Sequence, residues 1–226
     1  MVSPTRLSQA DRERLSDAIK EGEARSSAEL VLVIADQCGG YGLFAFLWPA
    51  LAALLLGGIA GLGIPELSGP RLFLIEGGIF VLLALLLHWP PILLRSVPLQ
   101  VRRAHAQQVA AHQFALRVEG RTQTRRGVLL FVAPTERQVF ILPDSGVAAV
   151  IDATAWRAII DRLVAGRPAR FPLEALVGAV ADILALLQRH FPRDEASASA
   201  LPDDVIELPR GSETGVATGN EQSPRP

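Results

Sequence analysis

Several residue types that mark common protein classes are scarce in this chain of 226 residues. Cys38 is the single cysteine, which excludes an intramolecular disulfide and a structural zinc site built on several thiolates. The formal net charge of −1 leaves no basic excess, which is the usual mark of a nucleic-acid-binding protein. We therefore expect no nucleic acid among its partners.

The common catalytic signatures are missing as well. The sequence has no His-Glu-x-x-His helix, no Walker A lysine loop, no Gly-x-Ser-x-Gly elbow and no pair of cysteines. Catalytic groups can come from distant loops, so this makes an enzyme less expected without excluding one.

Charge is absent from one long stretch of the chain. Residues 43–62 carry no charged side chain, and a run of about 20 apolar residues rising ~1.5 Å each is what a helix needs to cross ~30 Å of hydrocarbon. After a short polar break, residues 72–89 form a second apolar run in which only Glu76 and His88 are ionisable, both near its ends. We expect two transmembrane helices that form a hairpin within residues 41–97.

Buried helices of a soluble core are the alternative, but residues 54–56 and 81–87 are apolar on every face, whereas a core helix normally keeps a polar stripe. A cleaved signal peptide fits poorly, since the first run begins more than forty residues into the chain. Gly57 and Gly61 have the spacing of small residues that pack helices closely, either within the hairpin or between two copies of it.

Flanking charges predict the orientation. Arg95, Arg102 and Arg103 follow the second run within about 15 residues, whereas Arg71 is the single basic residue between the runs, and short segments rich in Lys and Arg stay cytoplasmic. We expect a cell (inner) membrane protein with two spans and a cytoplasmic soluble domain. Residues 77–118 contain no Asp or Glu, so this segment should also attract anionic head groups, at ~1 kcal/mol per basic residue near the surface.

Apolar periodicity predicts the elements of the soluble domain. In chain order they are a helix over residues 7–24 capped by Ser8 and Asp11, a buried strand at 28–35, a long helix at 98–120, strands at 127–133 and 137–143, a turn from Asp144, and helices at 154–165 and 173–190.

These elements predict one domain assembled from both sides of the hairpin. Residues 1–40 supply its first helix and strand, and residues 98–192 supply the remainder, about 130 residues in all and enough for one core. Residues 193–226 are rich in Ser, Ala, Asp, Glu, Gly and Pro and poor in apolar residues, so we expect them to be mostly disordered.

A set of short motifs, in order along the chain, resembles the TPM domain family, which is named for a thylakoid lumen protein, a photosystem II repair protein and a nematode receptor-associated protein. The chain is similar to a membrane-inserted, bacterial-type variant, over roughly residues 6–36 and 97–192. The residues that carry the resemblance are Glu23, Glu29, Ala111-x-x-Phe114, Arg125-x-Gly127-Val128-Leu129, Thr135-Glu136-Arg137, Asp144-x-Gly146, Trp156, Phe191-Pro192 and Leu201-Pro202-Asp203.

The resemblance implies an α/β fold, an αβα sandwich with a short central sheet. For some family members it also implies weak acid phosphatase activity and binding of Ca²⁺ or Mg²⁺ by acidic residues at the end of the sheet. Glu29 and Asp144 are the positions here that match such residues, and they are the candidate metal ligands. Phosphatase-like members carry an acidic residue and Asn before Gly-Val-Leu, where this chain has Arg125 and Arg126. The exchange removes potential oxygen ligands of a hard cation.

Glu29, Arg125 and Asp144 are therefore the candidate catalytic residues, each with a structural alternative. Arg125 and Arg126 would clamp a phosphate or carboxylate, or they pair with Glu119, Glu136 or lipid phosphates. Asp144 in a turn is more often an Asx-turn residue than a catalyst.

Two functions follow from these patterns. The first is an integral membrane protein that presents its α/β domain at the membrane surface as an interaction or assembly module. Its partners would be the lipid bilayer and another membrane or membrane-associated protein. The second is a weak membrane-bound acid phosphatase that depends on a divalent cation. The loss of oxygen ligands next to Gly127 favours the first.

Overall fold

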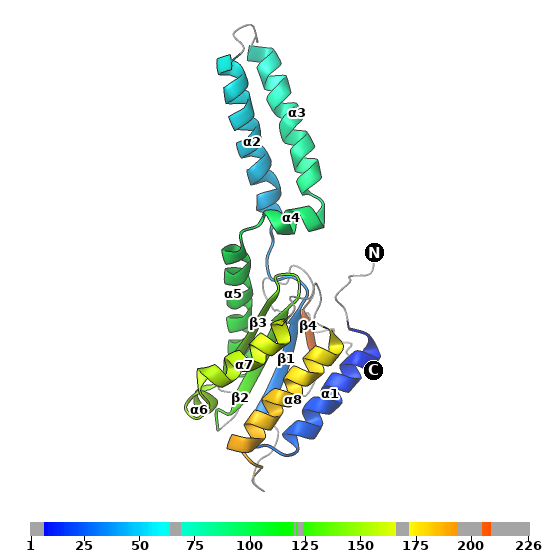
Figure 1. Cartoon of the computed structure of the whole chain (residues 1–226), viewed down its shortest axis with the longest axis vertical. Coiled ribbons are helices and arrows are strands. Elements are labelled where there is room, and N and C mark those ends of the chain that lie inside the picture. Colours follow the sequence, from blue (N-terminus) through cyan, green and yellow to red (C-terminus); the bar gives the residue numbers. More distant parts are fainter. Residues whose placement is uncertain are drawn as a thin grey trace, which may run out of the picture. The chain divides into compact units, whose positions relative to one another are not determined.

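The computed structural model describes residues 7–63, 69–119, 121, 124–165, 172–193 and 205–208. The chain forms two compact units, one made of Gly39–Arg102 and the other of the segments on either side of it. The elements are α1 (Gln9–Glu23), β1 (Glu29–Ala35), α2 (Gly42–Gly63), α3 (Gly69–Leu87), α4 (Pro90–Ser96), α5 (Leu99–Arg117), β2 (Gly127–Ala133), β3 (Gln138–Pro143), α6 (Ser145–Ala148), α7 (Ala153–Val164), α8 (Leu173–His190) and β4 (Ile206–Leu208) (Figure 1).

The sheet has the strand order β3-β2-β1-β4. β1 and β2 are parallel, with Glu29 opposite Gly127 and Ile34 opposite Val132, while β3 runs antiparallel to β2. Every residue of β1 and β2 is buried, which explains why both read as continuous apolar runs in the sequence. The two central strands thus come from opposite sides of the hairpin segment, as the sequence predicted.

Helices cover both faces of the sheet. Because side chains alternate along a strand, Leu30, Leu32 and Ile34 pack on one face with apolar residues of α1, α7 and α8. Val31 and Val33 pack on the other face with the α5 side chains Ala106 and Ala110. The predicted α/β fold, an αβα sandwich with a short central sheet, is confirmed.

The predicted cap of the first helix is also present. The Asp11 amide donates to Ser8 Oγ at 3.1 Å, and the Ser8 amide donates to Asp11 Oδ2 at 3.2 Å. This reciprocal capping box satisfies two donors that a helix start would otherwise leave unpaired. Leu15 and Ile19 then face the core.

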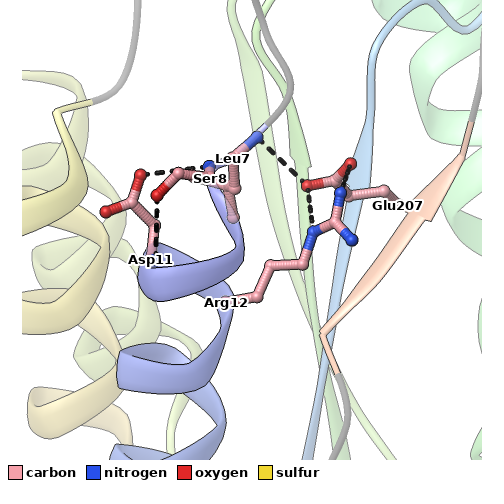
Figure 2. Close-up of polar contacts among 5 residues, drawn as sticks. All are labelled: Leu7, Ser8, Asp11, Arg12 and Glu207. Atoms are coloured by element: carbon pink, nitrogen blue, oxygen red, sulfur yellow. Dashed lines mark hydrogen bonds and ion pairs between the residues drawn. The ribbon is translucent and has the colours of Figure 1, made fainter.

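An unexpected strand lies in the segment that we expected to be mostly disordered. Ile206–Leu208 form β4, which pairs in parallel with Val33–Ala35 of β1, so the prediction is wrong at these residues. Glu207 fixes the strand to the start of α1, because its Oε1 accepts from the Leu7 amide and from Arg12 Nε, both at 3.1 Å (Figure 2). Arg12 Nη2 completes a two-pronged ion pair with Glu207 Oε2 at 3.0 Å. Residues 194–204 and 209–226 lie outside the described residues.

Two shorter differences have local causes. The second hairpin strand begins at Gln138 rather than at residue 137, since Arg137 has a φ of 56°, in the left-handed region. Asp144 starts the short helix α6 where we expected a turn. The polar pattern of a turn and that of a helix N-cap are the same, which explains the second difference.

The unit Gly39–Arg102 is built on an antiparallel pair of long apolar helices, α2 and α3. The Phe46 and His88 rings meet edge to face at 6.1 Å. Gly57 lies under the Glu76 side chain, and a Cβ at Gly61 would lie 3.2 Å from Leu72. Gly57 and Gly61 therefore serve packing within the hairpin. α4, which the sequence did not predict, lies across the ends of α2 and α3 (Figure 1).

Candidate functional site

The three candidate residues gather at one end of the sheet, where β1 and β2 begin and β3 ends. Glu29 pairs in register with Gly127, and the Glu29 amide donates to the Arg126 carbonyl at 3.1 Å. The Asp144 amide donates to the Gly127 carbonyl at 2.8 Å. The topology of the sheet thus brings Glu29, Arg125 and Asp144 to the same end of the sheet, although Glu29 is far from the other two in the sequence.

Asp144 is 3% exposed and uses one oxygen to start a helix. Its Oδ1 accepts from the Ser145 amide at 2.6 Å and from Ser145 Oγ at 3.2 Å. Its Oδ2 is buried and has no hydrogen-bond partner in the part of the chain that the structure describes. The capping bond matches the structural alternative for Asp144.

A tight backbone contact holds the loop before β2 against α6. The Gly146 amide donates to the Arg125 carbonyl at 3.0 Å. A Cβ at position 146 would lie 2.6 Å from that carbonyl oxygen and 2.8 Å from the Thr124 carbonyl oxygen, so only glycine fits without a shift. Arg125 itself has a φ of 50°, and its side chain is exposed.

Arg126, in contrast, contacts the segment where α8 ends. Its Nη1 donates to Ser27 Oγ at 2.8 Å, and its guanidinium lies 5.2 Å from the centre of the Phe191 ring. The Phe191 carbonyl also accepts from the Ser27 amide and from Ser26 Oγ, each at 3.0 Å. These contacts join the start of β1 to the end of α8, and nothing in the local sequence indicated them.

The opposite end of the sheet holds a buried pair that sequence reasoning missed. Glu136 is 0% exposed, and its Oε1 accepts from the Cys38 amide at 2.9 Å. Burial, together with the charge and hydrogen bond of Glu136, raises the pKa of the Cys38 thiol well above its ordinary value. The thiol is therefore protonated at neutral pH and is a poor nucleophile. Glu136 stands in a turn between two strands, where a sequence pattern predicts an exposed carboxylate.

No group of three or more His, Cys, Asp or Glu side chains in the described ranges is arranged to hold an ion. A divalent cation needs several oxygens, and Glu29 and Asp144 supply two side chains. Their roles as ligands of Ca²⁺ or Mg²⁺ stay a prediction.

Comparison with known proteins gives one family match and one structural match. The family model for the TPM domain matches residues 99–169. This chain carries a TPM domain. The solved structure of the BA42 protein from the psychrophilic bacterium Bizionia argentinensis is similar over 90% of this chain and 97% of that chain, with a TM-score of 0.53 and 14% identity. At this identity the likeness shows the fold alone. No curated protein matches the chain significantly.

The segment matched to the TPM domain model runs through α5, β2, β3, α6 and α7. Arg125 and Asp144 lie inside it, and Glu29 lies outside it in β1. The matched segment therefore supplies Arg125 and Asp144 to this end of the sheet. Glu29 reaches the same end because β1 pairs with β2. The catalytic roles of the three residues stay predictions.

Proposed function

We propose that this chain is an integral membrane protein that presents its TPM domain at the membrane surface as an interaction or assembly module. The α2–α3 hairpin is the anchor. The bilayer and another membrane or membrane-associated protein are the partners.

Exposed apolar side chains on two long helices carry the proposal. Both helices are long and apolar enough to cross a membrane, and α3 buries none of its residues. Leu62, Phe73 and Leu74 are 89%, 73% and 72% exposed. Removing a side chain of this size from water is worth about 1.5–3 kcal/mol, so a soluble protein seldom leaves so many on one surface. Hydrocarbon removes this cost, and helices satisfy their own backbone groups there.

The candidate polar groups support an interaction role over catalysis. Asp144 caps α6, and Arg126 joins β1 to the end of α8 through Ser27 and Phe191. Both side chains thus hold loops of the TPM domain in place. The alternative is a weak acid phosphatase that depends on a divalent cation.

Phosphate release distinguishes the two functions. We expect the purified full-length protein to release no more phosphate from an aryl phosphate than the same protein after heat denaturation, with or without Ca²⁺ or Mg²⁺. Turnover that requires one of these ions would establish the phosphatase instead.

A crosslinking scan tests the interaction role directly. A photoreactive residue is placed in turn at exposed positions of α5, α7 and α8 in the full-length protein within native membranes. We expect adducts from a group of positions that share one face of the domain. Adducts at no position, or scattered over all faces, would contradict a specific partner.

Orientation follows from the charges next to the spans. Arg95 and Arg102 follow α3, whereas Arg71 lies at its start, so the positive-inside rule puts the TPM domain in the cytoplasm. We expect a reporter fused after Pro226 to fluoresce if it is active only in the cytoplasm. A signal from a reporter active only outside the cytoplasm would reverse the assignment.

A further inference from the structure

We propose that the corner between α4 and α5 is a docking site for the head groups of anionic phospholipids, with the guanidinium groups of Arg95 and Arg102 as the binding groups. The inference rests on the membrane anchoring proposed above, and it adds a lipid class and two residues to it.

α4 is placed where the spans end. It follows α3 after Trp89, which is its N-cap residue and is 66% exposed, and it packs against both α2 and α3 (Figure 1). Trp48 of α2 donates from Nε1 to the Ser96 carbonyl at 3.2 Å, which ties the last residue of α4 to the first span. Exposed tryptophans beside apolar spans are typical of the zone where hydrocarbon meets head groups. α4 therefore lies at head-group depth when the hairpin is in a bilayer.

Two arginines on either side of the corner have no protein partner within the described part of the chain. Arg95 is exposed in the last turn of α4, and Arg102 is partly buried in the first turn of α5. Neither side chain forms an ion pair or a hydrogen bond with any residue in the described ranges, and Arg102 Nε is buried without an acceptor. Both side chains keep exposed surface, and a phosphate diester supplies the oxygens that a guanidinium binds in pairs.

The charge around the corner favours a lipid over an acidic protein segment. No Asp or Glu occurs in residues 77–118, so no carboxylate on this stretch competes for the two arginines. Ile92, which precedes Arg95 in the sequence, is 37% exposed, and Leu99, which lies between the two arginines, is 67% exposed. At a bilayer surface these apolar side chains can enter the acyl region while the neighbouring guanidinium groups stay among the head groups. The site is continuous with the lipid-facing surface of the hairpin.

Quenching of tryptophan fluorescence by brominated lipids tests the site in the full-length protein. The protein is reconstituted in vesicles of phosphatidylglycerol and phosphatidylcholine, with either one or the other brominated at equal mole fractions. Trp48 and Trp89 report on lipids next to the corner, while Trp156 is 5% exposed in the core and gives a constant background. We expect brominated phosphatidylglycerol to quench more strongly than brominated phosphatidylcholine. Each arginine should raise the affinity for the anionic lipid roughly fivefold, which corresponds to about 1 kcal/mol.

Paired variants assign the preference to the corner. Arg95→Gln/Arg102→Gln should quench equally with both lipids, and Arg95→Lys/Arg102→Lys should keep most of the preference because the charges remain. The control Arg157→Gln/Arg189→Gln removes the same charge from exposed positions of α7 and α8 and should behave as the unmodified protein.

The outcomes separate this site from the anchor. Equal quenching in the unmodified protein, or a preference that survives in Arg95→Gln/Arg102→Gln, would overturn the head-group site and leave the membrane anchor standing. No quenching by either lipid would overturn the anchor itself.

Discussion

Asp144 and Cys38 are two buried polar residues whose surroundings limit the chemistry of the α/β unit. Asp144 spends one oxygen on the cap of α6, and Cys38 is held protonated next to Glu136. Each can be tested with a single substitution.

Asp144 should be more important for folding than for hydrolysis. Asp144→Ala loses the cap and should lower the free energy of unfolding by about 1 kcal/mol, whereas Asn is as good a cap and should cost far less. Thermal unfolding of the purified protein measures the difference. Asp144→Asn should leave any phosphate release unchanged. A large loss of turnover in a well-folded Asp144→Asn protein would show that the carboxylate is catalytic.

Cys38 should make the folded state sensitive to alkali. Its folded pKa lies above the ordinary value of 9.0, so the unfolded chain loses this proton first as the pH rises. The stabilisation is complete below pH 9 and declines above it, by up to about 1.4 kcal/mol per pH unit. We expect Cys38→Ala to flatten the fall in the free energy of unfolding between pH 9 and 10.5. Parallel curves for the two proteins would contradict the buried, protonated thiol.

At the scale of elements, the hairpin and β4 depend on contacts that single substitutions reach. Gly57 and Glu76 meet between α2 and α3, while Gly58 has open space around it. Glu207 holds β4 against α1 (Figure 2).

Gly57→Leu should weaken the hairpin because the new side chain must displace Glu76. Gly58→Leu is the matched control and should be tolerated. The melting temperature of the reconstituted protein is the measurement, and adding Glu76→Ala to Gly57→Leu should recover part of the loss. Equal effects of the two leucines would argue against this register of α2 on α3.

Glu207→Ala should release β4 without loosening the other strands. The ion pair with Arg12 is partly exposed, so we expect a loss of at most about 1 kcal/mol. Hydrogen exchange at the Asp36 amide, which donates to the Leu208 carbonyl, should become faster. Exchange along the β2–β3 pair should not change. If the Asp36 amide is as protected as before, Glu207 is not the anchor of the strand.

Sequence patterns predicted most elements because burial on both faces leaves a continuous apolar run, as in β1 and β2, and burial on one face leaves a regular apolar period, as in α8. Only the family resemblance predicted that Glu29 and Asp144 lie at the same end of the sheet. Sequence patterns missed β4, whose three residues are too few to show a period, and the Cys38–Glu136 contact, whose partners are 98 residues apart. Contacts of that kind depend on how the sheet assembles and leave no local signal.

At the scale of the whole molecule, the α/β unit is assembled from segments on both sides of the apolar α2–α3 hairpin. β1 precedes the hairpin and β2 follows it, yet the two strands pair along their length. The domain core includes no residue of α2 or α3 among its buried clusters in the described chain. The hairpin should therefore be needed for membrane attachment and dispensable for folding.

Membrane fractionation of two proteins tests this claim most directly. The full chain should stay in the membrane pellet after washing with alkaline carbonate. A variant in which residues 39–97 are replaced by a short flexible linker should be soluble and should melt in one cooperative transition. Recovery of the full chain in the supernatant, or an aggregated deletion variant at every linker length, would contradict the account.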